Sequence, residues 1–138
     1  MPVPLVFRVP TPKLELFILR GFLDPETCKA LIARIDERRR PSTIADDIGI
    51  ANYRTSETCD LDGGDALVAS VNQRISDLLG LAGSHGEPIQ GQRYALGQEF
   101  KAHTDTFEPS RADYYVHCAD SGQRTWTAMC YLNDVEEG

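Results

Sequence analysis

The spacing of apolar residues changes once along this chain, and that change limits the possible folds more than any other feature. Before residue 80, two segments place apolar side chains three and four residues apart, which is the period of a helix. After residue 86 the pattern alternates, in the segments PIQGQRYAL, QEFKAHTD and RTWTAMCYLND. Helical spacing followed by strand spacing predicts an α+β domain, with helices packed on one face of a mostly antiparallel sheet.

Both predicted helices have recognisable ends. The first starts at Asp24, a capping residue, with Pro25 in the first helical position, and it ends in an arginine run before Pro41. Those arginines suit the negative end of the helix dipole. The apolar face of the second helix consists of Val68, Val71, Ile75, Leu78 and Leu79. Gly80 supplies its stop.

Three further segments have a recognisable character. Residues 14 to 20, LELFILR, form an apolar run of strand length. Residues 42 to 64 are rich in turn-forming residues and predict a long irregular excursion. Residues 106 to 123 separate two predicted strands by more than a tight hairpin requires. This last segment is either a mobile lid over a groove or a solvated loop with aromatic side chains packed beneath it.

Composition narrows the class of protein. The chain has 138 residues, 41% hydrophobic and 25% charged, which suits one domain, helical over about residues 1–85 and strand-forming over about 86–138. The net charge of −7 argues against nucleic acid or an anionic membrane surface as a partner. No segment approaches the roughly 20 apolar residues of a membrane span, and the four cysteines form no C-x-x-C pair. We therefore expect a cytoplasmic protein with free thiols.

His103 and Asp105 are the residues whose types and spacing most suggest chemistry. On a strand, residues two apart point to the same side, so these two side chains would project in parallel beside Lys101. An imidazole and a carboxylate placed this way can bind one cation from two sides. Facial triads of two histidines and one carboxylate hold non-haem Fe(II) with such groups. The pair alone would also fit a solvated strand face.

Four segments carry a resemblance to a known family. They read ILRGFLDPETCKALI, YRTSETC at residues 53 to 59, IQGQRYALGQEFKAHTD at 89 to 105, and GQRTWTAMCYLNDVEEG at 122 to 138. In their order and spacing, the sequence resembles the prolyl 4-hydroxylase family of Fe(II)- and 2-oxoglutarate-dependent oxygenases over most of its length. The resemblance implies N-terminal helices packed on a double-stranded β-helix of the jelly-roll or cupin type, truncated at its C-terminal end.

The resemblance also implies roles for single residues. His103 and Asp105 would be two iron ligands, and Tyr94 and Tyr131 would line the 2-oxoglutarate pocket. For both tyrosines, core packing with a satisfied hydroxyl is the alternative. Alternation supports Tyr131, because it would share a strand face with Thr127.

The same resemblance places three residues at the substrate groove. They are Arg54, Phe100 and Arg124. Each arginine could equally be a surface residue with a local carboxylate partner. Phe100 stands where relatives often carry tyrosine, so a hydroxyl contact to substrate would be missing.

The implied reaction is hydroxylation of a prolyl residue in a peptide or protein, with release of succinate and CO2. Its cofactors are Fe(II) and the cosubstrate 2-oxoglutarate, with molecular oxygen as oxidant and ascorbate as an optional addition. Asp105 favours hydroxylation over halogenation, because related halogenases lack this carboxylate. The acidic net charge favours a basic peptide. Free amino acids and other peptide side chains stay open as substrates.

The family pattern continues past NDVEEG, into further strands, a second iron-binding histidine and a basic residue for 2-oxoglutarate. Three accounts are therefore open for the 138 residues, and we expect the first. The chain is part of a longer enzyme. Alternatively, it is a non-catalytic β-helix module for protein interaction, or for a homodimer through exposed sheet edges. The third account is a site completed internally by His117 or His85.

Overall fold

The computed structural model describes residues 5–43, 52–119 and 122–136. In chain order the elements are β1 (Val6–Arg8), β2 (Phe17–Leu19), α1 (Pro25–Arg38), β3 (Arg40–Pro41), β4 (Glu57–Asp60), α2 (Ala66–Leu79), the 3-10 turn η1 (Gly83–His85), β5 (Gln90–Arg93) and α3 (Ala112–Cys118). Helices and small antiparallel sheets confirm the predicted α+β class. The double-stranded β-helix stays a prediction. No helix in the described ranges is long and apolar enough to cross a membrane.

The two long helices form where the sequence predicts them, with the predicted cap at Asp24 and the predicted stop at Gly80. The Oδ1 atom of Asp24 accepts a hydrogen bond from the backbone N–H three residues later, at 2.8 Å. Asp65 caps α2 in the same way, because its Oδ1 accepts from the N–H groups of Leu67 and Val68. Gly80 ends α2 with a φ of 67°, a left-handed conformation that glycine adopts without steric cost.

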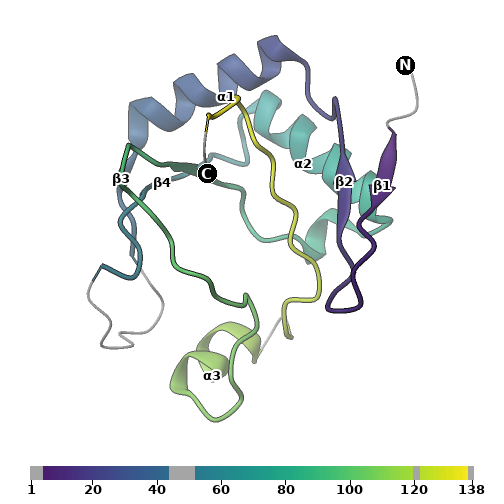
Figure 1. Cartoon of the computed structure of the whole chain (residues 1–138), viewed down its shortest axis with the longest axis vertical. Coiled ribbons are helices and arrows are strands. Elements are labelled where there is room, and N and C mark those ends of the chain that lie inside the picture. Colours follow the sequence, from purple (N-terminus) through teal and green to yellow (C-terminus); the bar gives the residue numbers. More distant parts are fainter. Residues whose placement is uncertain (1–4, 44–51, 120–121, 137–138) are drawn as a thin grey trace.

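The main sheet has the strand order β3-β4-β5, and α1 lies across β4 and β5 (Figure 1). Between them lies a small core of buried side chains, formed by Leu31, Ile35, Cys59, Leu61, Val68 and Val71. Gly91 of β5 faces Ile35 so closely that a Cβ atom there would stand 2.2 Å from Cγ1 of Ile35. The approach of α1 to the sheet therefore depends on a residue without a side chain.

Ion pairs fasten the end of α1 to the sheet. Arg39 of the arginine run lies 2.6 Å from Asp36 and 3.1 Å from Glu57 of β4. Arg93 of β5 lies 3.1 Å from the same Glu57 carboxylate. These pairs are partly exposed, so each contributes modestly, but together they tie three elements.

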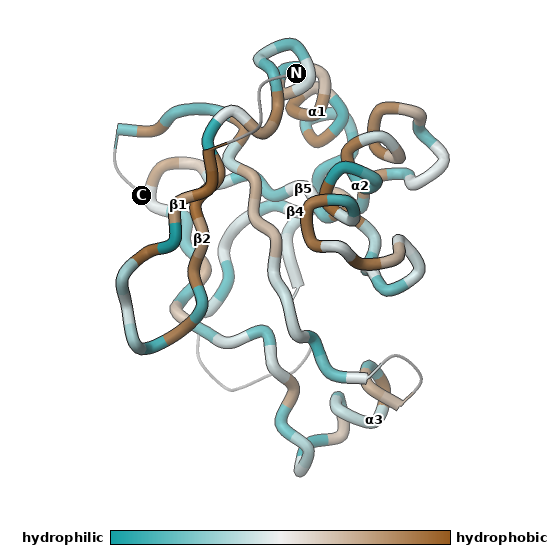
Figure 2. The backbone as a smooth tube through the Cα atoms, turned by 90° about the vertical axis from the view of Figure 1, so that its right-hand side faces the viewer, coloured by the Kyte–Doolittle hydropathy of each residue, from teal (hydrophilic) through white to brown (hydrophobic). Residues whose placement is uncertain are grey.

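The predicted strand at residues 14 to 20 is confirmed as β2, which pairs with β1 in a two-stranded hairpin. The hairpin carries a run of hydrophobic residues along both strands (Figure 2). Its apolar side chains are largely exposed: Phe7 is 56% exposed, Phe17 43% and Ile18 42%. Phe17 packs near Trp126, with ring centroids 6.3 Å apart.

The predicted irregular excursion at residues 42 to 64 is wrong in its second part, because β4, the middle strand of the sheet, lies there. Residues 44–51 of the excursion are outside the described residues. Thr58 and Cys59 are adjacent and are both buried, at 4% and 1% exposure. A strand that is covered on both faces shows no alternation of polar and apolar residues. The sequence therefore lacked the pattern that would have predicted β4.

Two other predicted strands are not strands. QEFKAHTD contributes one isolated bridge, between Phe100 and Arg54, and residues 124–132 have no regular structure. Alternation of polar and apolar residues indicates only which face of a strand each side chain would occupy. A strand forms only where a neighbouring strand pairs with its backbone N–H and C=O groups. Of the three predicted C-terminal strands, the described residues thus include only β5.

The segment predicted as a lid or loop contains a short helix, α3. After β5 the chain runs away from the sheet to α3, and the last described segment runs back toward α1 (Figure 1). Leu132 in that returning segment packs against the core.

Candidate functional site

Backbone pairing brings two distant segments together beyond the end of the β4–β5 ladder. The N–H of Thr55 donates to the carbonyl of Glu99 at 2.9 Å, and the N–H of Lys101 donates to the carbonyl of Tyr53 at 3.0 Å. The segment YRTS therefore lies beside EFKAHTD. This contact places the predicted iron ligands next to the predicted substrate arginine.

His103 and Asp105 face each other. The Nδ1 atom of His103 lies 2.8 Å from the carbonyl oxygen of Lys101. Because a carbonyl only accepts hydrogen bonds, Nδ1 carries the proton, and Nε2 of the neutral ring keeps its lone pair. Nε2 lies 3.6 Å from Oδ1 of Asp105. The backbone thus directs Nε2 of His103 toward the carboxylate of Asp105.

Aromatic packing holds the imidazole in this orientation. The ring of Phe100 stacks on the ring of His103, with centroids 3.7 Å apart and planes at 23°. Tyr53 meets Phe100 edge-on at 5.7 Å. The strand alternation expected from the sequence would have placed Phe100 and His103 on opposite faces, and it is wrong here because the segment is not a strand beyond the bridge.

Arg54 lies on this aromatic group and already has partners. Its guanidinium carbon lies 4.7 Å from the centre of the Phe100 ring. Its Nη1 donates to the carbonyl of Thr43 at 2.9 Å, and its Nη2 donates to the hydroxyl of Thr58 at 3.0 Å. Burial lowers the pKa of Arg54, and the nearby Tyr94 opposes that shift. Tyr94 is 47% exposed, and its hydroxyl donates to Gln92.

Thr127 is a site residue that sequence reasoning did not assign. Its hydroxyl donates to Oδ2 of Asp105 at 2.5 Å. The signal that could have found it was its alternation with Tyr131, which suggested only a shared face. The contact joins residues 22 positions apart, so no local pattern reveals it.

Arg124 lies near His103 and Asp105, but its guanidinium group is bound by the carboxylate of Glu87. Its Nε and Nη2 atoms donate to the two oxygens of Glu87 at 2.5 and 2.8 Å. The hydrogen bond that Arg124 donates to Glu87 raises the pKa of Arg124, and the same contact lowers the pKa of Glu87. The guanidinium also covers the ring of Phe107 at 4.7 Å. A local carboxylate partner was one of the two alternatives for this arginine.

The remaining candidates lie apart from the pair. Tyr131 is 81% exposed, and in the described part of the chain it makes no hydrogen bond or ring contact. His117 stacks on Phe107 with centroids 4.9 Å apart. Across residues 5–43, 52–119 and 122–136, no three His, Cys, Asp or Glu side chains gather as a metal site. Neither His117 nor His85 therefore completes a metal site with His103 and Asp105 in this structure.

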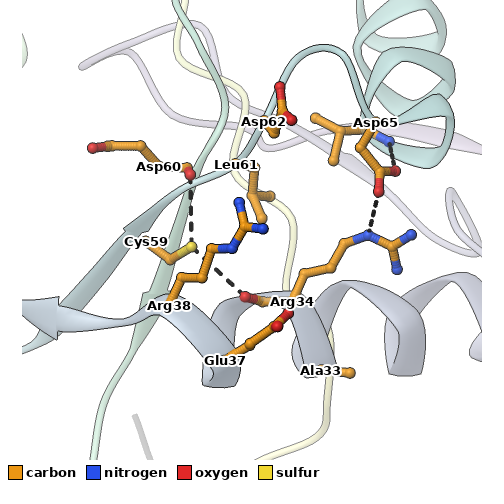
Figure 3. A pocket seen from close by; sticks show the side chains of 10 residues that line it. Ala33, Arg34, Glu37, Arg38, Cys59, Asp60, Leu61, Asp62 and Asp65 are labelled. Atoms are coloured by element: carbon orange, nitrogen blue, oxygen red, sulfur yellow. Dashed lines mark hydrogen bonds and ion pairs between the residues drawn. The ribbon is translucent and has the colours of Figure 1, made fainter.

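A pocket of about 340 Å³ lies elsewhere, between α1 and the loop that follows β4 (Figure 3). Its polar groups largely satisfy one another: Nε of Arg34 lies 2.9 Å from Asp65, and the thiol of Cys59 donates to the carbonyl of Arg34 at 3.7 Å. Neither His103 nor Asp105 lines it. His103 and Asp105 thus lie outside this pocket, with side chains that are about one-third exposed, at 32% and 36%.

The fold and the site define an α+β protein with an oriented histidine–aspartate pair, and comparison with known proteins supplies the family. Probable prolyl 4-hydroxylase 10 of Arabidopsis thaliana is 34% identical over 126 residues, which cover 88% of this chain and 42% of that protein. Prolyl 4-hydroxylase 2 of the same plant is 33% identical over 91% of this chain and 42% of its own length. Human prolyl 4-hydroxylase subunit alpha-1 is 28% identical over 90% of this chain and 22% of its own length.

The names of these relatives support a prolyl 4-hydroxylase-like family, which confirms the resemblance seen in the sequence. The chain spans about two-fifths of the Arabidopsis relatives it matches, at 42% of their length. No family model matches the chain. No solved structure matches it either.

Proposed function

We propose that this chain carries part of the metal centre of an Fe(II)- and 2-oxoglutarate-dependent dioxygenase, which hydroxylates prolyl residues of a peptide or protein. The observation that carries the proposal is the orientation of His103, whose Nε2 lone pair is directed at Asp105 by the bond from Nδ1 to a backbone carbonyl. The prolyl 4-hydroxylase relatives agree with this class of reaction.

The two side chains fit such a metal. An imidazole nitrogen and a carboxylate oxygen are donors that non-haem Fe(II) accepts. Two donors at about 2.1 Å from one ion can lie up to about 4.2 Å apart. The 3.6 Å between Nε2 of His103 and Oδ1 of Asp105 is within that limit. The pair supplies two ligands, so the proposed centre requires others.

Each residue would have a limited task. His103 and Asp105 would hold the metal, and Tyr94 and Tyr131 would contact 2-oxoglutarate. When bound, iron and 2-oxoglutarate would supply the oxidising power to break a C–H bond, with succinate and CO2 as co-products. Ascorbate would be an optional addition. The protein would position the substrate and limit the access of water.

The substrate groove would be formed by Arg54, Phe100 and Arg124. Both arginines lie over aromatic rings, so their planar groups could stack against an extended peptide as well as hold their present partners. The net charge of −7 favours a basic peptide.

A second function, a non-catalytic module for protein interaction, is favoured by one observation. The hairpin β1–β2 exposes Phe7, Phe17 and Ile18, each by more than 40%. Exposed apolar groups of this kind often mark contact surfaces.

An anaerobic titration with Fe(II) and 2-oxoglutarate separates the two functions. The proposal predicts a visible charge-transfer band, which Asp105→Ala abolishes. Asp77→Ala serves as the matched control, because Asp77 lies on α2 and, among the described residues, its side chain bonds only to Gln73. Because the proposed centre requires ligands beyond this pair, the absence of a band at millimolar metal contradicts the dioxygenase proposal only when the titrated protein includes those ligands; it would then leave the interaction module.

A further inference from the structure

The two oxygens of the Asp105 carboxylate have different surroundings. Oδ2 accepts a hydrogen bond from the hydroxyl of Thr127 at 2.5 Å. Oδ1 lies 3.6 Å from Nε2 of His103. Among the described residues, the bond from Thr127 is the only hydrogen bond that the Asp105 side chain makes. One oxygen is therefore held and the other is directed at the imidazole.

This difference matters because a carboxylate rotates easily. The torsion about the Cβ–Cγ bond of aspartate is broad, so an unrestrained Asp105 would present either oxygen, or both, to a cation. A hydroxyl bonded to an ionised carboxylate makes a short, charge-assisted bond, and the 2.5 Å contact is of that kind. Such a bond favours one rotamer and leaves a single oxygen on the side of His103.

The contact also joins two parts of the chain. Asp105 precedes α3 and Thr127 follows it, 22 residues later. The orientation of the carboxylate therefore depends on how the returning segment lies beside residues 103–105. Thr125, two residues before Thr127, is also exposed but has no such contact in the described structure.

We propose that Thr127 is a positioning residue, which holds Oδ2 of Asp105 so that Oδ1 alone binds the divalent cation shared with His103. The inference rests on the proposed metal site and goes beyond it by assigning how the carboxylate binds. Hydrogen-bond partners of metal ligands commonly change metal affinity by about 10- to 100-fold when removed.

The test is an NMR titration of the 138-residue chain with Mn²⁺, following paramagnetic broadening of the histidine ring signals. The chain has three histidines, so His85 and His117 are internal references for His103. We expect Thr127→Val to weaken the Mn²⁺ affinity reported by His103 at least tenfold. Thr127→Ser, which keeps the hydroxyl, and Thr125→Val, the matched control, should stay within twofold of the wild type.

The outcomes separate this inference from the proposed function. Selective broadening of His103 that is lost in Asp105→Ala, together with unchanged affinity in Thr127→Val, would overturn the role of Thr127 and leave the metal site intact. If Thr127→Val and Thr127→Ser weaken binding equally, the hydroxyl is not responsible and the inference also fails. Without selective broadening in the wild type, the metal site and the role of Thr127 fail together. Backbone spectra of each variant verify that it is folded.

Discussion

Asp65 joins two helices through its two carboxylate oxygens. Oδ1 caps α2 by accepting from the N–H groups of Leu67 and Val68. Oδ2 lies 2.9 Å from Nε of Arg34 on α1. The hydrogen bond from Arg34 is the main reason that the pKa of Asp65 lies below its ordinary value, with the two backbone N–H groups adding to the effect. A single side chain thus sets both the start of α2 and its position relative to α1.

This arrangement predicts a pH dependence of stability. Because the folded state lowers the pKa of Asp65, the unfolded chain binds the proton more readily. The stabilisation is therefore complete above the ordinary pKa of about 3.9, and it is lost as the pH falls through the lower folded value. Asp65→Asn keeps a capping oxygen but loses the charge. We expect the difference in urea midpoint between wild type and Asp65→Asn to be largest at neutral pH and to shrink under acid conditions.

Asp77→Asn, on the exposed face of α2, is the control for this experiment. Its difference from the wild type should change little over the same range. A difference for Asp65→Asn that stays constant with pH would contradict the linkage.

The contact of α1 with β5 depends on the absence of a side chain at one position. Gly91 pairs with Cys59 in the ladder and lies under Ile35, which is 5% exposed. Ile35 follows Cys28 and Leu31 at helical spacing, but the glycine opposite it gives no sequence signal for a helix packed above it. The close approach of these elements buries the middle strand β4 on that face.

Gly91→Ala should therefore destabilise the protein by about 1–3 kcal/mol, as overpacking of a core commonly does. The new Cβ would stand 2.2 Å from Cγ1 and 2.6 Å from Cδ1 of Ile35, which is buried and has little room to move. Chemical denaturation measures the change. Gly63→Ala is the matched control, because a Cβ there meets nothing within 4 Å.

A double variant tests whether Ile35 is the cause. Ile35→Ala removes both close atoms, so Gly91→Ala should cost less in that background than in the wild type. If the free-energy changes of Gly91→Ala and Ile35→Ala simply add in the double variant, the loss of stability in Gly91→Ala does not come from the contact with Ile35.

On the scale of the whole molecule, apolar groups are divided between a small core and an exposed hairpin. The core lies between α1, α2 and β4, while β1–β2 presents Phe7 and Ile18 to solvent. Among the described residues, the two strands pair only with each other, so each has an open edge there. Unpaired edges with apolar side chains favour association with another chain. This surface is where the homodimer that the sequence leaves open as an alternative would form.

We predict that the mass measured by sedimentation equilibrium rises with concentration, and that Phe7→Lys suppresses the rise. A charge at the centre of β1 would have to be desolvated in an edge-to-edge contact. Leu96→Lys is the control, because Leu96 is fully exposed in the turn after β5. Equal association of both variants would place the contact elsewhere.

Features that depend on neighbours a few residues away could be predicted from the sequence. The cap at Asp24, the stop at Gly80 and the H-x-D pair depend on hydrogen bonds or spacing within a few residues, and the family resemblance rests on such motifs. The α+β class followed from the change of period. At QEFKAHTD and RTWTAMCYLND, strands were predicted from residue alternation alone, and these predictions were wrong. A strand also requires a neighbouring strand that pairs with its backbone groups.

Only the tertiary structure decided which distant groups meet. Thr127 reaches Asp105 across 22 positions, Arg124 reaches Glu87 across 37, and the bridge of Arg54 with Phe100 spans two segments. Such contacts depend on the path of the whole backbone. Residues that far apart in the sequence share no periodic pattern that would predict a contact. The identity of the candidate metal ligands was therefore readable from local sequence, whereas the groups that orient them became visible only once the chain was folded.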